Sequence, residues 1–178
     1  MKARAASLAA ILAFAAASAA SAADKLYTAY NIWFEQPTKV YSTNYQKGNI
    51  LPAGSEVKDV KRSPGKLEFT DVNLDMRFTF EFVGKHHPGL TGEQWMDRFL
   101  TTRDFAALSQ GLTAAEIKAI KAGEVKAGMS RKAVLLAGGY PPEVATASTK
   151  LDTWKYWRHR FGSYLVQFSD GKVSKSEQ

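Results

Sequence analysis

The sequence predicts an α+β protein in which a small antiparallel β-barrel or sandwich is followed by two helices packed on a three-stranded sheet. Three patterns support this fold class. Residues 76–83 alternate apolar and polar side chains with a period of two, which is typical of a strand with one buried face. Thr91 and Thr113 each begin a four-residue capping box, which indicates the start of a helix. The pair Asp170-Gly171 between alternating residues is a strong signal for a β-hairpin.

Residues 24–90 are expected to form a β-rich domain. Short segments rich in aromatic and β-branched residues alternate with turns of Gly and Pro at regular intervals. Such spacing is typical of a small antiparallel barrel or sandwich, and the tight turns favour a barrel. The expected strands lie at residues 26–35, 40–45, 56–61, 66–70 and 76–83.

Residues 1–23 have the pattern of an export signal that is removed from the mature protein. A positively charged start precedes an apolar stretch at residues 8–17, and small residues fill positions 18–23. The apolar stretch is too short to span a bilayer, so an Ala-rich membrane anchor is the less favoured interpretation. We therefore expect export to the periplasm, with Ala23 or Asp24 as the first mature residue.

The chain contains no cysteine and carries a formal net charge of +7. The lack of cysteine excludes disulfides, thiolate metal sites and Cys nucleophiles, and leads us to expect a protein without the lipid that bacterial lipoproteins carry on an N-terminal Cys. The positive charge favours anionic partners such as lipid head groups, acidic glycans or acidic protein patches. Nucleic acid is not an expected partner, because the Lys and Arg residues are scattered and no nucleic-acid-binding motif occurs.

The second half of the chain is expected to combine helices with a final sheet. The capping boxes predict a linking helix within residues 91–112 and another helix that begins after Thr113 and stops at Gly123. Ser130 is suited to cap a third helix. Two amphipathic helices would then cover the aromatic face of the strands that follow, giving a two-layer unit over residues 113–178. The expected strands lie at residues 153–161, 164–168 and 172–174.

Four short segments of the second half follow one another in a recognisable order: Gly128-Met129-Ser130, Gly138-Gly139-Tyr140-Pro141, Trp154-Lys155-Tyr156 and Phe168-Ser169-Asp170-Gly171-Lys172-Val173. Through these segments, residues 117–173 resemble the SmpA/OmlA family, the BamE-like domain of the outer-membrane β-barrel assembly machinery. The resemblance implies a small antiparallel sheet with two helices on one side, and a binding role in outer-membrane assembly or maintenance. The repeat unit of β-lactamase inhibitor proteins has a similar architecture. The resemblance does not extend to residues 24–90.

The densest group of aromatic and basic residues lies in the segment predicted to form the first strand of this last sheet. Aromatic residues and Arg are the types enriched at the energetic centres of protein interfaces. One face of the strand must build the core, so packing within the sheet is the alternative role for the same residues. The residues predicted to bind a partner are Trp154, Tyr156, Trp157, Arg158 and Arg160.

Other candidate sites have simpler interpretations. His86 and His87 invite a metal site, but neighbouring side chains on an extended chain point apart, and an exposed turn is expected instead. His159 is expected on a half-exposed strand face. No nucleophile elbow, zinc-binding helix motif or phosphate-binding loop occurs. We therefore predict no catalytic residue, no metal and no cofactor.

These observations predict a binding or scaffold protein of the cell envelope, linked to outer-membrane assembly or maintenance, and not an enzyme. Its expected partner is an envelope protein or an anionic envelope component, with peripheral contact to the outer membrane. The alternatives are a periplasmic inhibitor or ligand-sensing protein and, less favoured, a cell-wall hydrolase, whose paired carboxylates the sequence cannot place.

Overall fold

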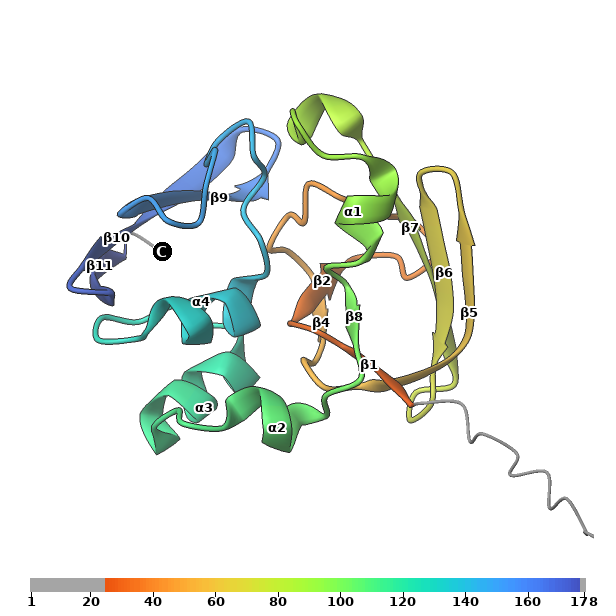
Figure 1. Cartoon of the computed structure of the whole chain (residues 1–178), viewed down its shortest axis with the longest axis horizontal. Helices are drawn as coiled ribbons and strands as arrows, with labels where there is room; N and C mark the ends of the chain where they lie inside the picture. The colour runs from red at the N-terminus through yellow and green to blue at the C-terminus, as the bar shows by residue number, and fades with distance from the viewer. Residues whose placement is uncertain (1–24, 177–178) are drawn as a thin grey trace, which may run out of the picture.

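The structure is a computed structural model that describes residues 25–176. The predicted export signal at residues 1–23 lies outside the described residues. The described chain contains a six-stranded, a three-stranded and a two-stranded sheet. Figure 1 shows the six-stranded sheet on the right and the three-stranded sheet on the left, with helices packed beside the latter. We refer to residues 25–112 as the first half and to residues 113–176 as the second half.

A curled, mixed six-stranded sheet dominates the first half. Strand β3 pairs with β7 in parallel, whereas every other neighbouring pair in this sheet is antiparallel. From edge to edge the strands are β3 (Val40–Tyr41), β7 (Met76–Glu81), β6 (Lys66–Asp71), β5 (Glu56–Ser63), β1 (Leu26–Thr28) and β8 (Leu100–Thr101).

The prediction of a small antiparallel barrel or sandwich over residues 24–90 is therefore wrong. Two non-local pairings explain the difference. Val40 in β3 aligns with Phe80 in β7 in a parallel register. At the opposite edge, Leu100 in β8 pairs with Thr28 in β1, so the sheet is completed by residues beyond position 90. Neither pairing leaves a local pattern in the sequence.

The expected strand at residues 26–35 is divided between two sheets. Its second part forms β2 (Ile32–Phe34), which pairs with β4 (Asn49–Leu51) in the two-stranded sheet. The division occurs at Asn31, which is almost fully buried. Its side chain donates to the Ile120 carbonyl at 2.6 Å and accepts from the Ala53 amide at 2.8 Å. A buried amide must find partners, and here they lie outside the sheet.

Aromatic side chains build the core of the first half. The alternation predicted for residues 76–83 is confirmed at Phe78 and Phe80, which are fully buried. Phe69 lies opposite Phe78 on the neighbouring strand, and its ring stacks on that of Phe80 with centroids 5.1 Å apart. Trp95 closes the core from the helix above the sheet.

Residues 91–112, predicted as a linking helix, contain α1 (Gly92–Met96), strand β8 and α2 (Phe105–Ser109). The Thr91 capping box is confirmed: its hydroxyl accepts from the Gln94 amide, and the Gln94 side chain accepts from the Thr91 amide. The helix then stops after little more than one turn, because the chain turns to pair with β1.

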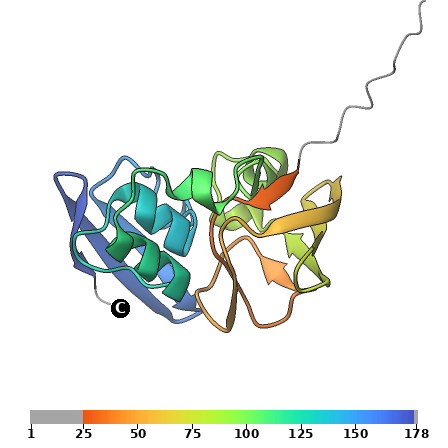
Figure 2. The same cartoon turned by 90° about the horizontal axis from the view of Figure 1, so that it is seen from below.

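The second half contains α3 (Ala114–Ala122), α4 (Arg131–Gly138) and an antiparallel sheet ordered β11 (Lys172–Ser176), β10 (Gly162–Ser169), β9 (Thr153–His159). Figure 2 shows both helices on one side of this sheet. The Ser130 cap is confirmed, as are the left-handed stop at Gly123 and the hairpin at Asp170-Gly171.

The predicted fold as a whole, a barrel or sandwich followed by a self-contained BamE-like unit of two helices and three strands, is wrong, although the α+β class is correct. The described residues form four α-helices, and the molecule is mostly β, with the curled six-stranded sheet as its largest element. The second half is also not closed upon itself, since the end of α4 packs against the first half. No helix among the described residues has the length and apolar character needed to cross a membrane.

A buried carboxylate joins the starts of α3 and α4. Glu116 accepts hydrogen bonds from the Thr113 amide at 2.9 Å and the Ser130 amide at 2.8 Å. Burial favours the neutral acid, but the hydrogen bonds from Thr113 and Ser130 outweigh it and lower the pKa of Glu116 to about 2. The same carboxylate thus completes the predicted capping box of α3 and holds the start of α4 in place.

Glu116→Gln should destabilise the protein at neutral pH by on the order of 3 kcal/mol, because the stability linked to its lowered pKa is lost. A lowered folded-state pKa stabilises above the unfolded value near 4.5, and this contribution is lost as the pH falls towards 2. Urea unfolding across this pH range should therefore show a flatter profile for the variant.

Glu124→Gln, at a half-exposed position just after the end of α3, is the matched control and should leave the pH profile unchanged. A Glu116→Gln profile parallel to that of the unmodified protein between pH 4.5 and 2 would contradict the assignment.

Candidate functional site

The two halves meet at the end of α4, where two glycines allow close approach. The Gly138 carbonyl accepts from the Asn44 side chain at 2.9 Å and from the Gln46 side chain at 3.2 Å. The Gly139 carbonyl accepts from the buried Tyr156 hydroxyl at 2.9 Å. Gly139 has a φ of +72°, and a Cβ atom there would lie within 2.8 Å of the Tyr30 ring. A larger residue would push the halves apart.

A polar cluster of Arg98, His87 and Glu143 also spans the junction. Both carboxylate oxygens of Glu143 are engaged, one by the Arg98 guanidinium and the other by His87 Nδ1 at 2.5 Å. His87 Nε2 lies 3.2 Å from the Ser42 carbonyl. Arg98 also lies over the Tyr140 ring, 4.6 Å from its centroid. We call Arg98, His87 and Glu143 the junction cluster.

The expected exposed turn at His86 and His87 is wrong for His87, which is buried and stacks on the Phe82 ring with centroids 5.4 Å apart. The short 3-10 helix η1 (Gly84–His86) turns the chain so that this ring points inward. The sequence carries no local sign of this, because the partner Glu143 lies far along the chain. Among residues 25–176, no group of three or more His, Asp or Glu side chains is arranged to hold a metal ion.

The pKa of Glu143 is lowered by its partners. Burial acts in the opposite direction, but the hydrogen bonds from His87 and Arg98 outweigh it. The carboxylate is thus held in its charged form by one residue that precedes α1 and one that follows it. This arrangement fixes the loop after α4 against the first half.

An open cleft of about 420 Å³ lies on the same junction, between the β1–β2 connection and α4. We call it the inter-half cleft. Its wall is mostly apolar, and its polar rim is cationic. The described side chains that line it include no Asp or Glu. The lining residues are Ala29, Tyr30, Arg98, Thr101, Arg103, Leu108, Lys132, Leu135, Leu136 and Tyr140.

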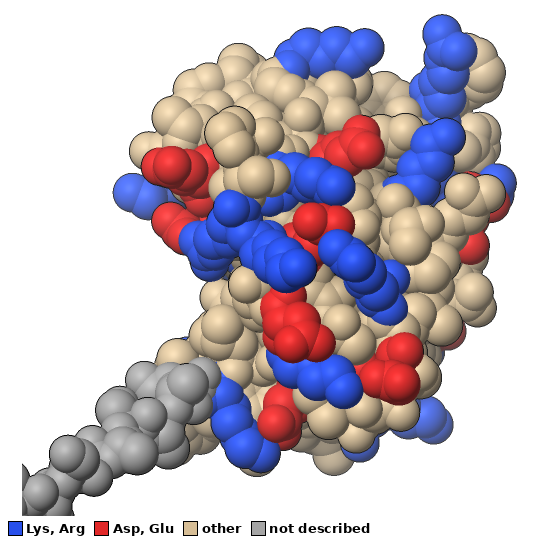
Figure 3. Space-filling model, turned by 90° about the vertical axis from the view of Figure 1, so that its right-hand side faces the viewer, with Lys and Arg blue, Asp and Glu red and all other residues tan. Residues whose placement is uncertain are grey.

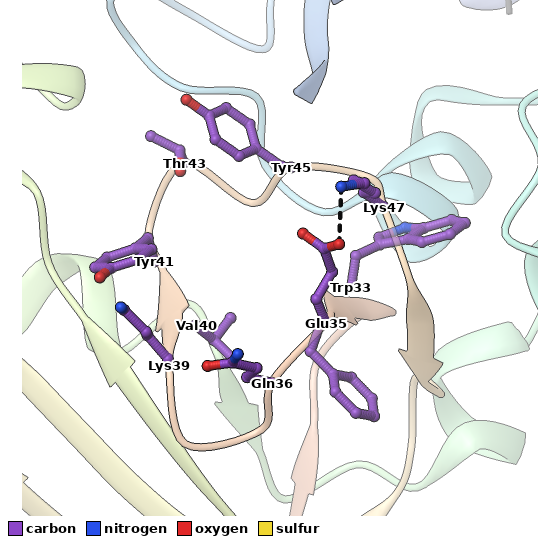
Figure 4. A pocket seen from close by; sticks show the side chains of 10 residues that line it. Trp33, Glu35, Gln36, Lys39, Val40, Tyr41, Thr43, Tyr45 and Lys47 are labelled. Carbon is purple, nitrogen blue, oxygen red and sulfur yellow. Dashed lines mark ion pairs between the residues drawn. The ribbon is translucent and has the colours of Figure 1, made fainter. Parts of the chain in front are cut away.

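A second hollow, of about 370 Å³, is enclosed by the loop that carries β2 and β3 (Figure 4). Glu35 and Lys47 pair across one side of it at 2.8 Å, in an exposed position. The Trp33 ring also lines this hollow, and its far edge lies beside Gly123 at the end of α3. The ion pair of the hollow is exposed, so the hollow carries less chemical information than the cleft.

The predicted partner-binding residues divide between buried and exposed positions in and just after β9. Trp154 and Tyr156 are buried beneath α3 and α4, so neither presents its ring to a partner in the folded protein. Trp157 is half-buried, whereas Arg158 and Arg160 are exposed. A role of these last three residues in partner binding stays a prediction.

Phe161 is a candidate that the sequence interpretation missed. We expected it to end the strand, with the turn at Gly162 and Ser163, but the turn between β9 and β10 is Arg160-Phe161. The Phe161 side chain is 85% exposed, the highest value among the exposed large apolar residues. We call residues 157–161 the hairpin tip. An aromatic residue next to Gly between two strands was the available signal.

Comparison with known proteins gave no relative: no family model, curated protein or solved structure matches this chain. The resemblance of residues 117–173 to the SmpA/OmlA family, and the assignment of the chain as a non-enzyme, therefore stay predictions.

Removing the carboxylate of the junction cluster should destabilise the protein. Glu143→Gln leaves Arg98 and His87 without a charged partner in a mostly buried position, which should cost about 3 kcal/mol of unfolding free energy in urea. The loss should shrink as the pH falls, since a carboxylate with a lowered pKa stabilises only while it is ionised.

Glu35→Gln breaks the exposed pair with Lys47 and should cost less than about 1 kcal/mol. Equal effects of the two substitutions would show that the junction cluster contributes no more than a surface ion pair.

Proposed function

We propose that this protein is a binding protein of the bacterial cell envelope that attaches reversibly to an anionic envelope surface through its hairpin tip. The observation that carries the proposal is the exposed Phe161 ring between cationic side chains. Arg160 lies over this ring, 5.3 Å from its centroid, and Arg158 precedes it by three positions. An exposed aromatic ring flanked by Arg is a combination suited to the interface of an anionic membrane.

The charge pattern supports an anionic partner at the tip. Lys155, Arg158 and Arg160 form no ion pair with any described acidic residue. The face over the six-stranded sheet differs, because there acidic and basic side chains lie side by side (Figure 3). Examples are the pairs Lys58–Asp75 and Arg77–Glu68. Positive charge without local compensation is thus available at the tip.

Contacts at Trp157 and Tyr164 hold the two strands of the hairpin in place, which leaves the exposed residues of the tip to engage a partner. The Gln46 amide donates to the Trp157 carbonyl at 2.9 Å, and the Tyr164 hydroxyl donates to the Gln46 side chain. Arg158 lies over the Tyr164 ring at 5.3 Å. These contacts fix the direction of the strands, so little conformational entropy is lost when the tip binds.

The expected strength matches a reversible contact. Burial of a Phe side chain gains about 1.5–3 kcal/mol, and each Lys or Arg near an anionic membrane adds about 1 kcal/mol. One ring and two arginines give about 4 kcal/mol, which corresponds to a dissociation constant of about 1 mM. The tip would thus locate the protein at a membrane surface without anchoring it. This agrees with the expected periplasmic location and scaffold role.

Vesicle binding tests this proposal. The protein should co-sediment with phosphatidylcholine vesicles that contain phosphatidylglycerol, and added salt should release it, since surface charges are screened. Arg158→Gln with Arg160→Gln should lower the partition constant by at least about tenfold. Phe161→Ser should lower the partition constant by about tenfold for every vesicle composition to which the unmodified protein binds.

The matched control is Lys58→Gln with Arg77→Gln, which removes the same charge from the six-stranded sheet and should bind as before. If this control lost as much binding as the tip variant, the net charge of the protein, and not a site at the hairpin tip, would determine vesicle binding. Equal binding to vesicles of phosphatidylcholine alone would contradict an anionic partner.

A further inference from the structure

The floor of the inter-half cleft is made of aliphatic side chains. Leu108 comes from α2, and Leu135 and Leu136 come from α4, where Leu135 remains half-exposed. The cleft measures about 420 Å³, within the range of roughly 300–1,000 Å³ typical of small-molecule sites. It also lies where two packed bodies meet, a usual place for such sites. An apolar group of modest size would bury this floor.

Cations surround the apolar floor without a matching acid. Arg103 donates to the Ala107 carbonyl at 2.5 Å, and Lys132 donates to the Gln110 carbonyl at 2.7 Å. Neither forms an ion pair with a described residue, and both side chains line the cleft. Backbone carbonyls orient the two cations but do not neutralise them.

Arg98 supplies a third cation from the opposite side. The junction cluster uses part of its guanidinium, which has five donors in all. The Tyr140 ring holds the guanidinium plane at the edge of the cleft. Glu143 already balances the charge of Arg98, so the uncompensated charge at the cleft comes from Arg103 and Lys132. Two unpaired cations beside an apolar wall favour an anion, because their attraction is stronger next to a medium of low dielectric constant.

We propose that the inter-half cleft binds a single-chain anionic amphiphile, with its apolar chain on Leu108, Leu135 and Leu136 and its carboxylate or phosphate head at Arg103 and Lys132. The site is separate from the hairpin tip and goes beyond the proposed attachment to a surface. The head would accept charge-assisted hydrogen bonds from both cations.

A peptide strand fits the cleft less well. The nearest sheet edge is β8, which has two residues and so offers almost no backbone for strand addition. The volume also suits one slender chain better than a helix. The chemistry of the cleft therefore favours a lipid-like ligand over an acidic peptide.

Calorimetric titration of the purified full chain tests the site with defined probes. Decanoate and decyl phosphate should bind in a saturable, one-to-one manner, and decanol should bind at least about tenfold more weakly, because it forms no charge-assisted hydrogen bond. The ratio of the two anions distinguishes a carboxylate site from a phosphate site. No saturable binding of either anion would overturn the proposal, as would equal binding of decanol.

Variants locate the binding. Arg103→Glu with Lys132→Glu should weaken decanoate binding by at least about tenfold and leave decanol unchanged. Leu135→Asn, at a half-exposed position, should weaken both probes. Lys61→Glu with Lys118→Glu makes the same charge change at exposed positions outside the cleft and should bind decanoate normally. Equal loss in this control, or tighter binding of a poly-glutamate peptide than of decanoate, would overturn the assignment.

Discussion

The arrangement of this molecule depends on one buried side chain, Asn31, at the point where the first strand leaves its sheet. Its amide group donates to Ile120 in α3 and accepts from Ala53, and its backbone amide donates to the Leu136 carbonyl in α4 at 2.9 Å. Three segments that are distant in sequence are thus tied by one residue. Each hydrogen bond that this buried amide lost would cost roughly 1–3 kcal/mol. The two halves are therefore held in one relative arrangement.

This arrangement of the two halves forms the two surfaces that we propose bind ligands. With α4 fixed beside β1, the glycines at its end pack against Tyr30 and Asn44, and the junction cluster closes one side. The gap that remains forms the inter-half cleft. Gln46, whose side chain donates to the Gly138 carbonyl, also holds Trp157 in the β9–β10 hairpin, and the turn of this hairpin projects Phe161 into solvent. The cleft and the hairpin tip are therefore two consequences of how the halves dock.

Features that depend on neighbouring residues could be predicted from the sequence. The caps at Thr91, Thr113 and Ser130, the stop at Gly123 and the final hairpin are confirmed, because capping and turn geometry are local. Features that depend on distant partners could not. The parallel pairing of β3, the edge strand β8 and the split at residue 31 each require a contact with a remote segment. Consequently the barrel or sandwich was the wrong fold.

The candidate site was hidden for the same reason. Nothing near His87 in the sequence indicated that its ring would be buried against Glu143. The alternation along β9 indicates one buried and one open face, and the structure buries Trp154 fully while Trp157 is half-buried.

The claim that most of this account rests on is that the two halves form one cooperative body tied at Asn31. Differential scanning calorimetry of the protein and of Asn31→Ala measures this directly. The account predicts a single transition for the unmodified protein, with equal calorimetric and van't Hoff enthalpies, and for the variant a lower melting temperature with a broadened or divided transition. Two independent transitions in the unmodified protein, or a variant with an unchanged melting profile, would contradict it.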